Sequence, residues 1–304
     1  MKRLLIVIVI LFHITLACAG GQGTRGGIIL NYPMSAQAIG MGEAFTAVAD
    51  DVNAIFWNPA GLSLLKQREL ICYYSNGAAD TKYLSVGYAQ TITSGVIGCG
   101  ISTLDGGKAA IYYPDGANRM VKAQSDFILM LSYAAGEIAK NLSIGSNLKI
   151  VHSELAETSK ATAFACDIGG LYRFSNNLNI GGVIQNIGTK MKYEEEGDAL
   201  PLNIKLGAAC RINDHCLIAL DIIKPIENEL KVNVGLEYWI IPKIAALRTG
   251  YKFYEKGNKS NSDIPLGAGL KMGSYQLDYA YVPHQDLSNT HQISLLVKLG
   301  GVRH

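Results

Sequence analysis

Residues 38–62 of the sequence, AIGMGEAFTAVADDVNAIFWNPAGL, gather the residue types most able to do chemistry. Gly40 and Gly42 come just before a short amphipathic run, as they would in a phosphate-binding turn at the start of a helix. A dinucleotide-binding turn would have its third glycine at position 45, which is Phe45, and no strand–helix–strand repeat follows. The stretch therefore does not predict a nucleotide site, and we expect no cofactor.

No other cluster of residues predicts catalysis or a bound metal. The sequence has no HExxH, GxSxG or CxxC motif. His284, Asp286 and His291 lie near one another in the sequence, in a polar stretch that is more typical of a solvated loop than of a metal or acid–base site. The five cysteines after residue 19 have the spacing of neither a zinc site nor a dense disulfide framework. We expect a protein that is not an enzyme.

The first nineteen residues read as a secretory signal peptide. A basic start is followed by an apolar stretch over residues 4–16 and by a small-residue cleavage pattern that ends at Ala19. Lipidation of Cys18 is the alternative, but Thr15 stands three residues before it, where a lipoprotein signal usually has leucine. We expect cleavage after Ala19 and an exported mature protein.

The composition of the exported chain narrows its class. No later stretch approaches the roughly 18 uninterrupted apolar residues that a transmembrane helix needs, yet only 17% of residues are charged. The 33 glycines and 16 tyrosines are typical of an outer-membrane β-barrel, although a soluble β-sandwich is also compatible with them. A formal net charge of +2 gives no reason to expect a nucleic-acid partner.

From residue 68 onward, apolar and polar residues alternate with period two, which predicts strands rather than helices. Most of these runs reach the roughly 9–11 residues that a tilted strand needs to cross a bilayer. We predict fourteen strands, at 68–76, 82–92, 95–104, 124–135, 142–153, 161–174, 177–188, 202–212, 216–224, 229–240, 243–254, 264–272, 275–282 and 289–299.

The placement of charges separates a membrane barrel from a sandwich. In these strands the charges share a face with glycines and small polar residues, and the apolar residues form the other face. A Lys or Arg that faces lipid near the bilayer midplane costs about 2–4 kcal/mol, so the charged face must line the lumen. Short connections between the strands alternate with longer ones. Outer-membrane barrels show the same alternation, with short periplasmic turns and longer external loops. We therefore predict an all-β, 14-stranded antiparallel transmembrane barrel over residues 68–304, with candidate lumen charges Lys205, Lys231, Glu237, Arg248, Lys252 and Asp167.

Residues 20–67, which precede the first strand, predict a small helical hatch that plugs the lumen. Apolar residues recur at helical spacing from Phe45 onward, and Asn58-Pro59 ends the run because a residue before proline avoids helical dihedrals. Asp50 and Asp51 are candidate counter-charges for a basic lumen, with Arg248 or Lys205 as expected partners.

Three aromatic residues of the hatch have two interpretations. Phe45, Phe56 and Trp57 are candidate contacts for a hydrophobic ligand. Packing of the hatch against the barrel wall is the other explanation, and it is the more common one for buried aromatic residues.

Residues 35–62 also carry a family resemblance. SAQAIGMGEAFTAVADD followed by NAIFWNPAGL resembles the N-terminal signature of the PorV/PorQ family, which is similar to the FadL outer-membrane transporters. The resemblance implies a fourteen-stranded barrel with a hatch in its lumen, in the bacterial outer membrane. It rests on a hatch motif made of Gly40, Gly42, Asp50, Asp51, Asn58, Pro59 and Gly61.

The resemblance implies two functions. PorV-like members belong to type IX secretion and receive secreted proteins after translocation, so the expected partners are secretion-machinery proteins or secreted cargo, besides the outer-membrane lipid. FadL-like members pass long-chain fatty acids or other hydrophobic small molecules. The motif is closer to the PorV/PorQ side, and a lumen rich in charges is a poor path for an acyl chain. We therefore expect a component of protein secretion, with the FadL-like channel as the alternative.

Overall fold

A computed structural model describes residues 26–77, 80–112, 118–193, 197–226, 228–254, 264–284 and 288–300. The expected signal peptide, including Cys18, lies outside the described residues, and so does Asp286. No helix in the described ranges is long and apolar enough to cross a membrane.

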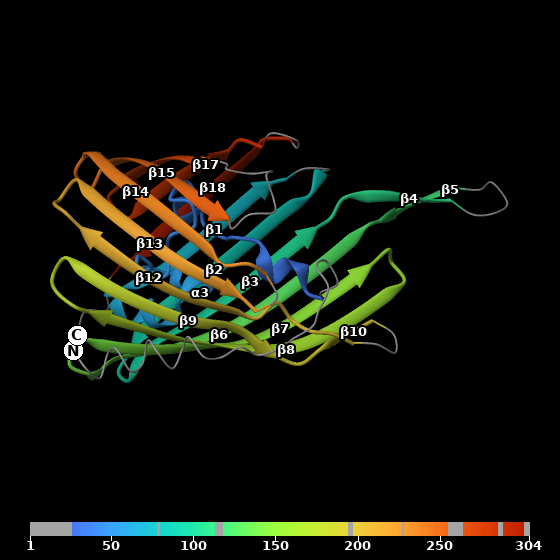
Figure 1. The fold of residues 1–304 in the computed structure, drawn as a ribbon, viewed down its shortest axis with the longest axis horizontal. Helices are drawn as coiled ribbons and strands as arrows, with labels where there is room; N and C mark the ends of the chain where they lie inside the picture. The colour runs from blue at the N-terminus through green and yellow to red at the C-terminus, as the bar shows by residue number, and fades with distance from the viewer. Residues whose placement is uncertain are drawn as a thin grey trace.

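The strands form one closed antiparallel barrel (Figure 1). Neighbours along the chain pair in order, and β1 pairs with β18 from Arg68 opposite Leu299 to Asn76 opposite His291, which closes the ring. The prediction of fourteen barrel strands is confirmed, with small shifts at strand ends. They are β1 (Arg68–Asn76), β2 (Lys82–Ile92), β3 (Gly95–Asp105), β6 (Gln124–Ala139), β7 (Leu142–Leu155), β8 (Ser159–Arg173), β9 (Leu178–Gly188), β12 (Asn203–Arg211), β13 (Cys216–Pro225), β14 (Lys231–Ile241), β15 (Ala245–Tyr254), β16 (Leu266–Met272), β17 (Tyr275–Val282) and β18 (Thr290–Leu299).

The barrel is apolar outside and charged inside. Leu148 and Leu247 point outward and are 65% and 52% exposed, whereas Asp167 and Arg248 are 0% and 3% exposed. A soluble protein would reverse this pattern, because it would leave large apolar side chains in water. In a bilayer the outward leucines face lipid, and the charges keep their polar partners in the lumen.

Two connections contain strands that the sequence did not predict. β4 (Lys108–Tyr112) and β5 (Asn118–Lys122) pair as a hairpin, and β10 (Met191–Lys192) pairs with β11 (Gly197–Asp198). Figure 1 shows the β4–β5 hairpin reaching far beyond the barrel, at the same end as β10. The hairpin is mostly exposed, with Val121 of β5 as a buried exception, so no alternating pattern marks it in the sequence. Because the longer connections lie at this end, we call it the external end.

The hatch lies inside the barrel and consists of very short elements. They are η1 (Ile28–Asn31), α2 (Ala36–Gly40), α3 (Ala54–Trp57) and η2 (Pro59–Leu64). The helical run expected from Phe45 onward is wrong, since the backbone forms turns there and a helix begins only at Ala54. The N–H groups of Phe45, Thr46 and Val52 bond to carboxylates of the barrel wall, and this anchoring interrupts the helical ladder.

Candidate functional site

The candidate site is the interface between the hatch and the lumen wall, and its glycines allow the two backbones to touch. Gly42 has φ of +62°, a left-handed conformation that disfavours other residues. It lies against Gly250 of β15, and a Cβ on Gly250 would overlap the backbone of Met41 and Gly42. Glycine at these positions therefore lets the hatch pack directly on the wall.

Asn58 and Pro59 join two parts of the hatch to the barrel. The Asn58 side chain donates from Nδ2 to the carbonyl of Thr46 at 2.9 Å and to the carbonyl of Gly170 at 3.1 Å. Its Oδ1 accepts a hydrogen bond from the backbone N–H of Ala60, which caps η2 with Pro59 at its first position. Asn58 is fully buried, so each of these bonds replaces water that it has lost.

Wall side chains accept hydrogen bonds from the backbone of the hatch. Oδ2 of Asp221 accepts from the N–H groups of Phe45 and Thr46, both at 2.9 Å, and from Oγ1 of Thr46 at 2.7 Å. Glu69 likewise accepts from the N–H of Val52 at 2.9 Å. The sequence marked Asp221 only as an acid on the lumen face, because its partners lie more than 170 residues away.

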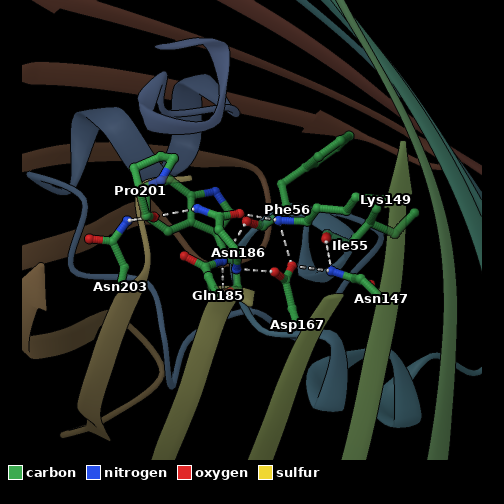
Figure 2. Close-up of polar contacts among 10 residues, drawn as sticks. Ile55, Phe56, Asn147, Lys149, Asp167, Gln185, Asn186, Pro201 and Asn203 are labelled. Carbon is green, nitrogen blue, oxygen red and sulfur yellow. Dashed lines mark hydrogen bonds and ion pairs between the residues drawn. The ribbon is translucent and has the colours of Figure 1, made fainter. Parts of the chain in front are cut away.

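A second polar cluster holds the opposite side of the hatch (Figure 2). Asn147 donates to the carbonyl of Ile55 at 2.8 Å, and Gln185 donates to the carbonyls of Phe56 and Trp57, each at 3.2 Å. The wall therefore supplies donors where the hatch presents carbonyls, and acceptors where it presents N–H groups.

Asp167 organises this cluster. Its carboxylate accepts from Lys149 at 2.7 Å, from Asn147 at 2.8 Å and from the backbone N–H of Asn186 at 2.8 Å. The register of β8 and β9 shifts at this point, and Asn186 has φ of +66°. This β-bulge aims consecutive side chains of β9, Gln185 and Asn186, at the lumen instead of alternating them.

Arg248 of β15 forms a buried triad with Glu237 of the adjacent β14 and with Asp278 of β17, which lies two strands away. Its Nε donates to Glu237 at 2.7 Å, and its Nη1 donates to Asp278 at 2.8 Å. Gln37 of the hatch also donates to Glu237, at 3.3 Å. The expected pairing of Arg248 with Asp50 or Asp51 is therefore wrong, because wall acids already surround this guanidinium.

The hatch aspartates Asp50 and Asp51 do not contact the basic lumen residues expected as their partners. Asp50 is exposed and Asp51 is buried, and neither makes an ion pair within the described residues. The Asp51 carboxylate accepts from the backbone N–H of Asn53 at 2.8 Å. Burial, together with the nearby carboxylates of Glu69 and Asp50, raises the pKa of Asp51 to about 8. The hatch acid that pairs with a lumen lysine is Glu43, which contacts Lys252.

The three candidate aromatic residues of the hatch lie in two different environments. Phe45 is buried and packs edge-on against Trp57, with ring centroids 5.8 Å apart. Phe56 and Trp57 line a cavity of about 290 Å³, which Phe45 does not reach. The Trp57 indole donates to the carbonyl of Met34 at 2.7 Å, which fixes its ring at the cavity wall.

This cavity opens toward the external end of the lumen. Pro201, Pro225 and Asn228, which lie at the external ends of strands, form part of its lining. Lys205, Lys231 and Lys252 also line it, and the Lys205 ammonium lies 4.9 Å from the centroid of the Trp57 ring. The described ranges hold no group of three or more His, Cys, Asp or Glu residues that could bind a metal.

One known protein family matches the sequence of this chain. The family described as "Type IX secretion system protein PorV" matches residues 24–242, which include the whole described hatch. The chain belongs to the PorV family. No curated protein matches the sequence.

Solved structures share the fold of this PorV-family barrel. The Pseudomonas putida toluene transporter TodX aligns with a TM-score of 0.62 and 13% identity, over 86% of this chain and 96% of that chain. A Pseudomonas aeruginosa FadL homologue aligns with a TM-score of 0.57 and 14% identity, over 87% of this chain and 98% of that chain. FadL-like barrels of this kind are the structural neighbours that the hatch motif predicted.

Proposed function

We propose that this PorV-family protein is a non-enzymatic component of type IX protein secretion at the bacterial outer membrane, and that its lumen stays closed while it works. The family match supports the role in secretion. The bonds between hatch and wall support the closed lumen, and they are the single observation that carries this part of the proposal.

The chain then divides into three parts. Residues 1–19 are removed on export, residues 20–67 form the hatch, and residues 68–304 form the barrel. The outward apolar face contacts outer-membrane lipid, and the partners are secretion-machinery proteins or secreted cargo at the ends of the barrel.

The energetics favour a hatch that stays in place. A hydrogen bond to a charged group contributes about 1.5–3 kcal/mol, and a neutral one about 0.5–1.5 kcal/mol. Withdrawing the hatch would break several bonds of both kinds, at Asp221, Glu69, Asn147 and Gln185, and would leave their buried partners without water. A protein that docks partners at its surface does not have to meet this cost.

A channel for hydrophobic compounds is the second candidate, and two observations favour it. The fold is that of a toluene transporter and a FadL homologue, and Phe56 and Trp57 line a cavity. The lysines around the same cavity oppose it, because they make a poor path for a neutral hydrocarbon.

A strain that lacks the gene for this protein distinguishes the secretion role from the channel role. We expect loss of surface delivery of secreted proteins, with uptake of a labelled long-chain fatty acid and of toluene unchanged. Complementation with the wild-type chain should restore delivery, and immunoblotting of outer-membrane fractions checks that the barrel is present. Loss of uptake with normal delivery would overturn the proposal.

A further inference from the structure

The external cavity of about 290 Å³ carries an excess of positive charge. Four lysines line it, namely Lys149, Lys205, Lys231 and Lys252. Glu43 is the one acid among the described lining residues and contacts Lys252, and Asp167 pairs with Lys149, so lysines outnumber acids in the lining. A concave site of one charge sign concentrates ions of the opposite sign.

Lys205 is a half-buried cation in the lining of this cavity. Within the described residues its ammonium makes no ion pair and has no hydrogen-bond acceptor, and it lies 4.9 Å from the centroid of the Trp57 ring. An ammonium group has three N–H donors, so this one needs water or an anion to satisfy them. On the neighbouring strand, Oδ2 of Asp221 accepts from Phe45 and Thr46 of the hatch, and its Oδ1 makes no hydrogen bond to Lys205.

Asn233 is a second, independent sign of a missing partner. It lines the same cavity and is only 2% exposed, yet its Oδ1 has no hydrogen-bond partner. An unsatisfied buried amide costs about 1–3 kcal/mol, so such groups normally meet a ligand or water. The assignment of N and O in an amide can be reversed, so Asn233 can present a donor to the cavity.

The rest of the lining combines polar amide side chains with an apolar part, and the cavity volume limits the size of the ligand. Phe56, Trp57, Ile128 and Ile223 supply flat and branched surfaces next to the lysines. The volume of about 290 Å³ lies just below the roughly 300–1,000 Å³ typical of small-molecule sites. It suits a compact body such as one aromatic ring and leaves little room for a long acyl chain.

We propose that this cavity binds a compact organic anion, which carries a carboxylate or sulfonate on an aromatic or short aliphatic body. The oxyanion accepts from Lys205 and Asn233, and the apolar body lies against Trp57. The proposal does not depend on the role in secretion, since it rests on the cavity alone.

Binding of benzoate and of its neutral isostere benzamide to the full mature chain in non-ionic detergent tests the proposal. The chain has two tryptophans, so Trp239→Phe leaves Trp57, which lines the cavity, as the only tryptophan, and its emission is excited selectively at 295 nm or above. Titration calorimetry gives a dissociation constant that does not depend on fluorescence. We expect saturable binding of benzoate in the millimolar range or tighter, at least tenfold tighter than benzamide, and weakened by added salt.

Variants locate the interaction. Lys205→Gln should weaken benzoate at least tenfold and leave benzamide unchanged, whereas Lys205→Arg should retain binding. The matched control is Lys108→Gln, which removes an exposed lysine on the β4–β5 hairpin. Asn233→Asp puts a negative charge in the cavity and should abolish benzoate binding, so it tests the site even where Lys205→Gln fails to fold. The altered gel mobility of a folded barrel identifies variants that fold.

Three results would overturn the proposal. They are equal affinity for benzoate and benzamide, unchanged benzoate binding in folded Lys205→Gln or Asn233→Asp, and no saturable binding of benzoate.

Discussion

Replacing Asp221 with alanine tests how firmly the barrel wall holds the hatch. The Asp221 carboxylate is buried and accepts three hydrogen bonds from the hatch, from the N–H groups of Phe45 and Thr46 and from Oγ1 of Thr46. Alanine removes the acceptor for all three and adds no new contact. The barrel strands keep their own ladder of hydrogen bonds, so the effect should be local to the hatch.

The magnitude follows from the three donors. Each hydrogen bond to a charged group contributes about 1.5–3 kcal/mol, and buried donors left without a partner cost about 1–3 kcal/mol each. The carboxylate also pays a desolvation cost for being buried, and alanine removes that cost, which offsets part of the loss. We therefore expect local opening of the hatch around Thr46 to become easier by about 3–5 kcal/mol, which corresponds to at least a hundredfold in the opening equilibrium.

Hydrogen exchange followed by mass spectrometry measures this directly. Peptides that contain Phe45 and Thr46 should lose protection in Asp221→Ala, whereas peptides from β6 and β7 should keep it. The control variant is Asp214→Ala, which removes an exposed carboxylate at the short turn before β13. Unchanged protection at Phe45 and Thr46 would refute the idea that Asp221 anchors the hatch. A uniform loss over the whole barrel would refute its local character.

Three further predictions concern the hatch and the lumen. The pKa of Asp51 is raised in the folded state, so the hatch binds a proton that the unfolded chain releases, and its stability should fall as pH rises from about 4 to about 8. Hydrogen exchange of the hatch at pH 5 and pH 8 measures this, and Asp51→Asn should remove most of the dependence. Arg248→Met should cost about 3–5 kcal/mol in denaturant unfolding, because two buried carboxylates lose their counter-charge. A disulfide between Ser63→Cys and Gly136→Cys should form, since the two Cβ positions are 3.7 Å apart, and should leave secretion intact.

Each of these predictions has an outcome that contradicts it. Equal pH dependence in wild type and Asp51→Asn would assign the effect to other groups. A loss of less than about 1 kcal/mol in Arg248→Met would mean that the triad contributes little beyond its own desolvation cost. Secretion that is lost only when the disulfide has formed, and is normal in both single-cysteine variants, would show that secretion needs η2 of the hatch to move away from β6.

The barrel could be predicted from the sequence because its rule is local. Each strand alternates between lipid and lumen, and a shift of one residue would move every charge into lipid. This rule placed Asp167 and Arg248 inside before any contact was known. It missed the β4–β5 hairpin, which is mostly exposed and needs no alternation.

The pairing of charges could not be predicted in the same way. Arg248 meets Glu237 and Asp278 because β14, β15, β16 and β17 lie side by side in a particular register. A count of positive and negative lumen charges pointed instead to Asp50 and Asp51 as its partners. The identity of a partner depends on which side chains reach across the lumen, and net charge holds no information about that.

The sequence by itself determined the fourteen-stranded barrel, because membrane solvation dictates an alternation that neighbouring residues show directly. The PorV-type hatch was implied by the family resemblance of residues 35–62. Only the tertiary structure decided how the hatch is held and where a ligand could bind. Those features depend on contacts between residues far apart in the chain, such as Asp221 with Thr46 and Lys205 with Trp57. Closing the ring sets the strand register, and the register decides which of the inward side chains meet.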